Sequence, residues 1–349
     1  MPRLPPTAHV TALCALAGGL IGCGGLGGGG GGGYNLPNRG IAPYVRVDLG
    51  DAETPVLHVL APDEADLTEL REPSGLVDGD RVVLFFEVRD RATGAAYIAR
   101  SSSDASGAVF GAQEPVLLPQ DVGAWALDRV GAPSVIQTPD GWLMAFAYGD
   151  GDGIGLARSD DGIDFVADPA PLLAREPSTE LRVDSPSIAR FDGRLLLYYE
   201  TLAAAEGATL SIARAQIDGA SATPQGLILQ AGSDCLGADG AADPCWDRSG
   251  VGSPEVRASR TATGRTVLRL FYAGYAGKRA DLGFAASFDG AQWSRFVFNP
   301  VVAEKADERE ATNLRFGSEY LLYFVEVGTA AQHGIALSVN DAGVPSETF

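Results

Sequence analysis

The same two-strand pattern recurs five times along this chain of 349 residues. Each copy has an apolar segment with aromatic residues, a turn, and a second segment centred on Ala-x-Ser or Ala-x-Ala. The central alanines are Ala99, Ala157, Ala213, Ala285 and Ala336, at steps of 58, 56, 72 and 51 residues. A period of this length built from strands and turns is typical of propeller blades, which stack because none buries its faces alone. The sequence therefore predicts an all-β, five-bladed propeller of four-stranded antiparallel blades.

The composition agrees with one large globular unit. Length alone would suggest two domains, but propellers of this size form one unit. Hydrophobic residues make up 46% of the chain and charged residues 20%, which is enough for a substantial core. The formal net charge of -19 leaves no basic stripe to neutralise phosphates, so nucleic acid is not an expected partner.

The first 22 residues have the pattern of a secretion signal. Arg3 supplies the positive start, and the apolar run 10–21 is too short to span a bilayer as a mature helix. The run ends in Leu20-Ile21-Gly22-Cys23, which resembles the lipobox of bacterial lipoproteins. That resemblance implies cleavage before Cys23 and lipidation of its side chain. The alternative is an ordinary secretion signal with an incidental cysteine.

A glycine tract follows, since Leu26 is the one other residue type in 24–33. Such a tract predicts a flexible tether with a reach of about 18 Å. We therefore expect a signal over 1–22, the lipidated cysteine and tether over 23–43, and the propeller over 44–349. Gly24 is not the aspartate associated with inner-membrane retention, so the resemblance favours the outer membrane of a bacterial cell envelope. We expect a monomer that touches the membrane through its lipid alone.

Two of the four cysteines belong to the predicted fold. Cys14 leaves with the signal and Cys23 carries the lipid, which leaves Cys235 and Cys245 on either side of a polar loop. In an oxidising compartment this spacing predicts a disulfide, worth about 3 kcal/mol on a chain-entropy argument. Two cysteines without neighbouring histidines make half of a zinc site, so zinc is not expected.

A short strand precedes each apolar strand and usually opens with proline. The five openings are 72–74, 132–134, 185–187, 253–255 and, without proline, 310–312. Proline is tolerated at the first residue of a strand because its missing amide need not join the ladder. In a propeller these strands line the central channel, and their N-terminal ends gather on one face. The last blade has three strands of its own, so we expect 44–47 or 56–59 to supply the fourth.

The openings and the Ser-x-Asp-Gly turns at 159–162 and 287–290 resemble the five-bladed propeller glycosidases. That group includes the arabinanases and xylosidases of glycoside hydrolase family 43, the invertases and the levansucrases. There the base or nucleophile and a second aspartate precede the prolines of blades one and two, and a glutamate in blade three is the acid. The matching residues here are Glu72, Ala132 and Asp184. The resemblance implies an inverting glycosidase with Glu72 as base and Asp184 as acid, but without the middle carboxylate. The turns are expected to be structural.

An arginine precedes each inner strand. These are Arg71, Arg129, Arg182, Arg248 and Arg309, and they are accompanied by Glu72, Asp128, Asp184, Asp247 and Glu310. Guanidinium groups offer forked donors to carboxylates, phosphate and hydroxyls, so a ring of alternating charge could hold a ligand. It could equally be a structural ring of ion pairs. Because ligands collect at the mouths of such channels, we expect a ligand site.

Aromatic residues and one histidine lie near the same face. Trp125 and Trp246 stand in loops before inner strands, where they could stack on a sugar ring or pack within the loop. Trp142 is expected in the core. His333 lies in the last rim turn and is a weak candidate for contact with a channel cation such as Ca²⁺. No cofactor is expected to be required.

Together these features favour a lipid-anchored, carbohydrate-active protein that acts on extracellular or periplasmic oligo- or polysaccharides. Two alternatives stay open. Ala132 favours a non-catalytic, glycan-binding or scaffolding propeller. The arginine ring suits a phosphate-dependent phosphorylase, because the related mannoside phosphorylases use one carboxylate and basic residues around phosphate. Fold alone does not decide among these activities.

Overall fold

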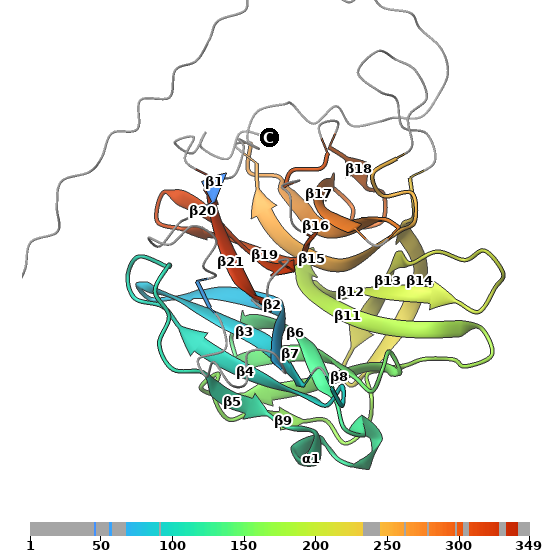
Figure 1. Cartoon of the computed structure of the whole chain (residues 1–349), viewed down its shortest axis with the longest axis horizontal. Coiled ribbons are helices and arrows are strands. Elements are labelled where there is room, and N and C mark those ends of the chain that lie inside the picture. Colours follow the sequence, from blue (N-terminus) through green and yellow to red (C-terminus); the bar gives the residue numbers. More distant parts are fainter. Residues whose placement is uncertain are drawn as a thin grey trace, which may run out of the picture. The chain divides into compact units, whose positions relative to one another are not determined.

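Five antiparallel sheets surround a common axis in the computed structural model (Figure 1). The structure describes residues 45–46, 56–57, 68–90, 92–232, 245–261, 263–277, 279–296, 299–302, 307–327 and 333–340, all within the unit Leu36–Phe349. Helical structure in these residues is limited to α1 (Pro119–Val122) and the 3-10 turn Ala124–Ala126. No helix in the described part of the chain is long and apolar enough to cross a membrane. The predicted signal and tether lie outside these residues. The predicted five-bladed propeller is confirmed.

The blades follow one another along the chain. Blade 1 contains β2 (Thr68–Asp78), β3 (Arg81–Asp90), β4 (Ala96–Ser102) and β5 (Glu114–Leu117). Blade 2 contains β6 (Val130–Thr138), β7 (Gly141–Tyr148), β8 (Gly153–Ser159) and β10 (Leu173–Ala174), with β9 (Val166–Ala167) also paired to β8. Blade 3 contains β11 (Glu180–Phe191), β12 (Arg194–Ala203), β13 (Ser211–Asp218) and β14 (Ser221–Leu229). Blade 4 contains β15 (Gly250–Arg260), β16 (Thr266–Ala276), β17 (Arg279–Ser287) and β18 (Ser294–Arg295). Blade 5 contains β19 (Asp307–Phe316), β20 (Glu319–Val327), β21 (His333–Asn340) and β1 (Val45–Arg46).

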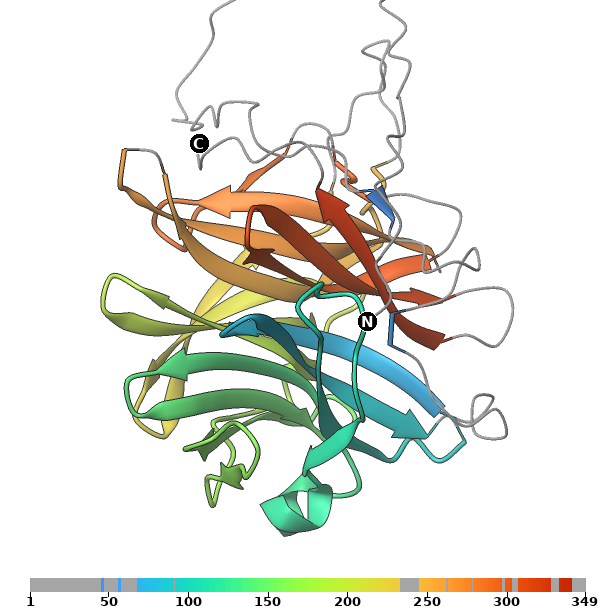
Figure 2. The ribbon, with the colours of Figure 1, turned by 90° about the vertical axis from the view of Figure 1, so that its left-hand side faces the viewer.

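The N-terminal strand completes the last blade, as predicted. Val45 and Arg46 of β1 pair with Val339 and Ser338 of β21. Leu57 adds a second connection to the same strand, because its amide and carbonyl both bond to Ile335 at 3.2 and 2.8 Å. Figure 2 shows blade 1 (blue) between blade 5 (red) and blade 2 (green). Closing the ring with a strand from the other end of the chain reduces exposed sheet edges.

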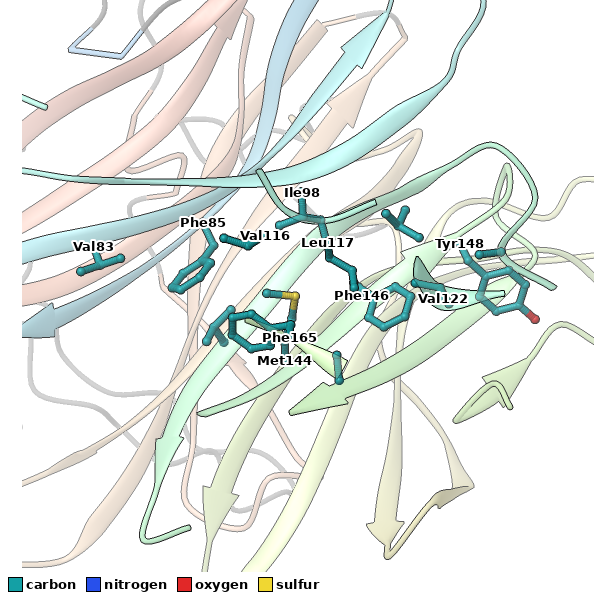
Figure 3. Close-up of a cluster of buried hydrophobic side chains, with 14 residues drawn as sticks. Val83, Phe85, Ile98, Val116, Leu117, Val122, Met144, Phe146, Tyr148 and Phe165 are labelled. Carbon is teal, nitrogen blue, oxygen red and sulfur yellow. The ribbon is translucent and has the colours of Figure 1, made fainter. Parts of the chain in front are cut away.

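Consecutive residues of each second strand pack against different neighbouring blades. On β3, Phe85 packs toward blade 2, in one cluster with Met144 (Figure 3). Phe86 packs toward blade 5, in a different cluster with Tyr323. This alternation follows from the two-residue period of a strand whose two faces are both covered. The same division holds for the aromatic pairs 198–199, 271–272 and 323–324. It explains why the repeated apolar segments carry consecutive aromatic residues.

The Ser-x-Asp-Gly turns join blades at the ends of the third strands. Ser159 Oγ accepts the amide of Gly162 at 2.9 Å, which fixes the turn, and the Gly162 carbonyl accepts from Arg100 of blade 1 at 3.0 Å. The equivalent Gly290 carbonyl accepts from the Tyr198 hydroxyl of blade 3 at 3.1 Å. These contacts give the turns the structural role expected of them. Trp142 packs against the core between blades 1 and 2, also as expected.

All five inner strands share one backbone irregularity. The residue at each opening has a positive φ, namely Glu72 (48°), Ala132 (44°), Ser185 (46°), Ser253 (45°) and Glu310 (55°). The pairing register with the second strand shifts at the same place in every blade. A non-glycine residue in this region costs about 1–3 kcal/mol, so surrounding contacts must hold each bulge in place.

Below the bulges, hydroxyl groups connect consecutive inner strands. The hydroxyl oxygens of Ser74, Ser134, Ser187 and Thr312 accept the amides of Val135, Ile188, Val256 and Gly75 at 2.8–3.0 Å. Each of these bonds joins one blade to the next, and the last returns from blade 5 to blade 1. Glu255 occupies the corresponding position in blade 4, where its Oε1 accepts from the Thr312 hydroxyl at 3.2 Å. The central strands β2, β6, β11, β15 and β19 are therefore bonded in a circle (Figure 1).

Candidate functional site

The amides of the bulge residues are bound by carboxylates. The amides of Glu72, Ala132, Ser185 and Ser253 donate to the carboxylates of Glu310, Glu87, Asp184 and Glu200 at 3.0, 3.1, 2.8 and 3.2 Å. Carboxylates that satisfy buried amides are among the stronger hydrogen-bond acceptors in proteins. The bulges thus gather acidic side chains at the N-terminal ends of the inner strands, which is the face that the sequence indicated.

Glu87 and Glu200 were not identified from the sequence. Each follows an aromatic pair on a second strand, and each bonds the bulge amide of the next blade. Gly131 and Gly252 make room for them, since an added Cβ would lie 1.9 Å from Glu87 Oε2 and 2.0 Å from Glu200 Oε2. Two sequence features together could have identified them. One is a glutamate that directly follows two aromatic residues on the second strand of a blade, and the other is a glycine two residues before the proline of the next blade. Glu87 therefore places a carboxylate beside Ala132, the position that the sequence comparison with propeller glycosidases left without one.

Arginine side chains link these carboxylates into a chain of alternating charge. Arg129 bonds Glu87 at 2.9 Å and Asp184 at 3.0 Å. Arg182 bonds Asp184 at 2.9 Å and Glu200 at 2.6 Å. The chain runs through blades 1, 2 and 3, and its groups are mutually compensated inside a largely buried site. A separate pair joins Arg71 to Glu310 between blades 1 and 5.

The four acidic groups nearest the axis have pKa values that are shifted in different directions. Burial alone would raise the pKa of Asp184, but Arg129 and Arg182 lower it below its usual value. Burial likewise opposes ionisation of Glu310, yet Arg71 lowers the pKa of that carboxyl. Burial raises the pKa of Glu72 well above its usual range, and the charge of Glu310 raises it further. Burial also raises the pKa of Glu200, despite its pairing with Arg182. The pKa of Glu72 is thus shifted toward the protonated form, in the opposite direction to the pKa values of Asp184 and Glu310.

The Glu72 side chain reaches toward the opposite blades. Its Oε1 accepts from the hydroxyls of Ser185 at 2.8 Å and Ser253 at 3.4 Å. Glu72 and Ser253 line an axial cavity of about 250 Å³, which the inner strands of all five blades enclose. Asp184 has no exposed surface and does not line this cavity. Of the two carboxyls that the resemblance selected, Glu72 is therefore the one that a ligand in the channel can touch.

The predicted arginines divide into three groups. Arg71 and Arg182 border the site with side chains that are 23% and 32% exposed, while Arg129 is buried beneath it. Arg309 lies close enough to Glu310 to help lower its pKa. Arg248 is exposed, and it donates to the carbonyl of Cys245 at 3.2 Å within its own loop.

Two of the acidic residues that accompany these arginines in the sequence, Asp128 and Asp247, lie away from the axial carboxylates. Asp128 is exposed, and Asp247 pairs with Arg295 at 3.2 Å rather than with the axial groups. Tyr275 was not predicted, but burial and the nearby charges of Glu200 and Glu310 raise the pKa of its hydroxyl. The arginines of blades 1, 2, 3 and 5 therefore lie among the axial carboxylates, while Arg248 of blade 4 makes a local contact.

The two loop tryptophans pack within their own blades. Trp125 stacks on Phe146 with ring centroids 6.0 Å apart, and Trp246 lies 5.6 Å from the Tyr272 ring. An added Cβ at Gly155 or Gly283 would lie 2.8 or 2.5 Å from these indoles. Each tryptophan fills the space over a glycine of the third strand. Of the two roles left open by the sequence, the described contacts are those of packing.

Three predictions fall partly outside the described residues. Cys245 is buried, but its predicted partner Cys235 is not described, so the disulfide stays a prediction. The His333 side chain is also outside the description. Within the described ranges, no group of three or more His, Cys, Asp or Glu side chains is arranged to hold a metal ion. Calcium binding accordingly stays a prediction.

Solved structures share this fold, whereas no family model and no curated protein matches the chain. A structure described as a glycoside hydrolase has a TM-score of 0.62 at 17% identity, covering 84% of this chain and 93% of its own. A glycosyl hydrolase from Bacteroides ovatus gives 0.61 at 15%, covering 90% and 98%. A member of the GH130 family of mannoside phosphorylases, which contains glycoside hydrolases that target β-1,2 mannosidic linkages, gives 0.59 at 14%, covering 90% and 98%. The chain has the fold of the glycoside hydrolase-like five-bladed propellers, which confirms the resemblance at the level of architecture.

The raised pKa of Glu72 predicts a specific pH dependence of stability. The pKa of a glutamate in an unfolded chain is about 4.3. If folding raises this pKa, the free energy of unfolding decreases as the pH rises from about 4.3 through the pKa of the folded state. Glutamine cannot ionise, so we expect Glu72→Gln to gain stability over the wild type as pH increases above about 4.3. Urea unfolding of both proteins over a pH series measures this difference.

Asp184→Asn is the control of opposite sign. The pKa of Asp184 is lowered on folding, so its contribution is present above the unfolded value and is lost as pH falls through the folded one. The variant should therefore be less stable than the wild type at neutral pH. A Glu72→Gln difference that does not change with pH would contradict the assignment.

Proposed function

We propose that this chain is a lipid-anchored, carbohydrate-active propeller of the bacterial cell envelope that cleaves a glycosidic bond in an oligo- or polysaccharide. The observation that carries the proposal is Glu72, which lines the axial cavity and has a pKa that is shifted toward the protonated form. A general acid needs a proton at working pH and contact with the leaving oxygen. The shared fold of glycoside hydrolase-like propellers supports the same class of activity.

The pKa directions reverse the roles that the resemblance implied. A base must be ionised and an acid protonated, yet Glu72 has the raised pKa and Asp184 the lowered one. In the proposed step the Glu72 proton moves to the glycosidic oxygen, the bond from that oxygen to the anomeric carbon breaks, and a nucleophile bonds to the carbon. Asp184 is a positioning residue here, because it acts through Arg129, Arg182 and the amide of Ser185.

The source of the nucleophile separates hydrolysis from phosphorolysis. In inverting hydrolysis a second carboxylate takes a proton from the attacking water. The pKa values of Asp184 and Glu310 are lowered, but both carboxyls are almost fully buried and bound to arginines. Phosphate is already an anion and needs no such base, and the partly exposed Arg71 and Arg182 offer forked donors to it. These arginines favour phosphorolysis as the second candidate function.

Turnover of synthetic glycosides tests the proposal. Aryl arabinosides, xylosides, fructosides and galactosides would be incubated with and without phosphate. We expect the wild type to release product from at least one, and Glu72→Gln to lower kcat by about 10²- to 10⁴-fold. The loss should shrink with a dinitrophenyl leaving group, which departs without protonation. Dependence on phosphate identifies phosphorolysis.

Glu114→Gln is the matched control, because this exposed residue of β5 makes the same chemical change far from the axis. Its turnover should equal that of the wild type. Glycan binding without product from any substrate would remove the catalytic proposal and identify a non-catalytic, glycan-binding propeller. An equal loss with every leaving group would show that Glu72 is not the acid.

The lipid anchor is tested at Cys23. Because a thioether-linked lipid requires this side chain, Cys23→Ser should move the protein from the membrane fraction to the soluble fraction of the expressing cells. Retention of the variant in the detergent phase of a Triton X-114 partition would contradict the anchor. A monomeric body with a disulfide between Cys235 and Cys245 fits the same oxidising compartment.

A further inference from the structure

A second cavity lies between blades 4 and 5, at the ends of β15 and β19 that are remote from the bulges. It measures about 180 Å³. Arginines from three strands line it, namely Arg257 on β15, Arg269 on β16 and Arg315 on β19. The whole chain carries a net charge of -19, so a group of three guanidiniums around one small space stands out. Neither hydrolysis nor phosphorolysis at Glu72 uses this cavity.

Two of these arginines face each other directly. Arg257 and Arg269 are cross-strand partners, so their side chains leave the same face of blade 4, the face that packs on blade 5. Like charges placed opposite one another destabilise a sheet. Arg269 is also only 6% exposed, and its guanidinium lies 4.8 Å from the Tyr320 ring and 5.7 Å from the Phe284 ring. Guanidinium groups that converge on one small cavity offer several donors to a bound anion.

Two acceptors border the same cavity. Glu255 replaces the serine or threonine found at this position of the other four blades, and it is 9% exposed. Its Oε1 accepts from Arg257 and Thr312, whereas its Oε2 has no hydrogen-bond partner among the described residues. Ser259 Oγ is likewise buried without a partner in the described structure. A buried polar atom without a hydrogen bond lowers the stability of the fold, so a ligand that donates a hydrogen bond to each of these two atoms would be favoured.

We propose that this cavity binds a small oxyanion that also carries hydroxyl groups, which is the chemistry of a sugar acid or a sugar phosphate. Arg269 and Arg315 would hold the carboxylate or phosphate, and Glu255 and Ser259 would accept hydrogen bonds from the hydroxyls of the same molecule. At about 30 Å³ of liquid for each water, the cavity has room for a ligand the size of one monosaccharide. The cavity adjoins the axial one, since Glu255, Arg257 and Ala258 line both, but Glu72 lines the axial cavity alone, and Arg269 and Arg315 line the second cavity alone.

Titration of the intact protein in detergent tests this proposal. The probes are D-galacturonate, glucose 6-phosphate, neutral galactose and sulfate, each at the same ionic strength and followed by calorimetry. We expect at least one of the two acidic sugars to bind at least about tenfold more tightly than galactose and than sulfate. Galacturonate alone would identify a carboxylate ligand, and glucose 6-phosphate alone a phosphate ligand. Binding of neither, or of sulfate equally well, would overturn the proposal.

Four variants locate the binding. Arg315→Gln changes an exposed side chain and should weaken the acidic sugar about tenfold or more, because a charged hydrogen bond is lost. Arg194→Gln removes the same charge from an exposed position of blade 3 and should leave affinity unchanged. Glu255→Ser restores the residue type of the other blades and should reduce the preference for the sugar over sulfate. Equal affinity in Arg315→Gln and Arg194→Gln, or loss of binding in Glu72→Gln, would place the ligand elsewhere and contradict the proposal.

Discussion

A carboxylate bound to a backbone amide holds the opening of each of the first four inner strands. The residues at these openings have left-handed backbone angles, which for glutamate, alanine and serine are unfavourable without compensation. Glu310, Glu87, Asp184 and Glu200 supply that compensation, three of them from a neighbouring blade. The same contacts that keep the strands in register therefore bring acidic groups to the axis. The stability of the propeller and the chemistry of the axial site thus depend on one set of hydrogen bonds.

That dependence explains why Glu72 differs from its neighbours. The carboxylates that hold bulge amides are bonded to arginines or amides and are almost fully buried, which commits them to the structure. Glu72 is itself a bulge residue, and its side chain bonds two serine hydroxyls instead of a guanidinium. Burial and the neighbouring charge of Glu310 both raise its pKa, whereas arginines lower the pKa values of Asp184 and Glu310. The contacts that fix the four amide-binding carboxylates thus leave Glu72 in surroundings that shift its pKa toward the protonated form.

The sequence was sufficient for the architecture because the repeat, the prolines at 73, 133, 186 and 254 and the consecutive aromatic residues each report a local requirement of a blade. Closure by residues near Val45 followed from counting strands. The site was harder to predict, because its members come from different strand positions in different blades. Glu87 stands beside Ala132 only after two blades pack, and Gly131 shows its purpose only then. The direction of the pKa shifts could not be predicted from the sequence either, since the pKa of Asp184 depends on two arginines that are 55 and 2 residues away. Arg248 shows the reverse difficulty, because its sequence position matches that of the other four arginines while its described contact is local.

Direct observation of the Glu72 carboxyl would test the central claim. Carbon-13 NMR of protein labelled at the glutamate δ carbons follows each carboxyl through a pH titration, and the resonance that disappears in Glu72→Gln identifies this group. The account predicts that this resonance titrates well above the ordinary glutamate range, while that of Glu310 titrates below it. A Glu72 carboxyl that ionises at or below the ordinary value would contradict the account.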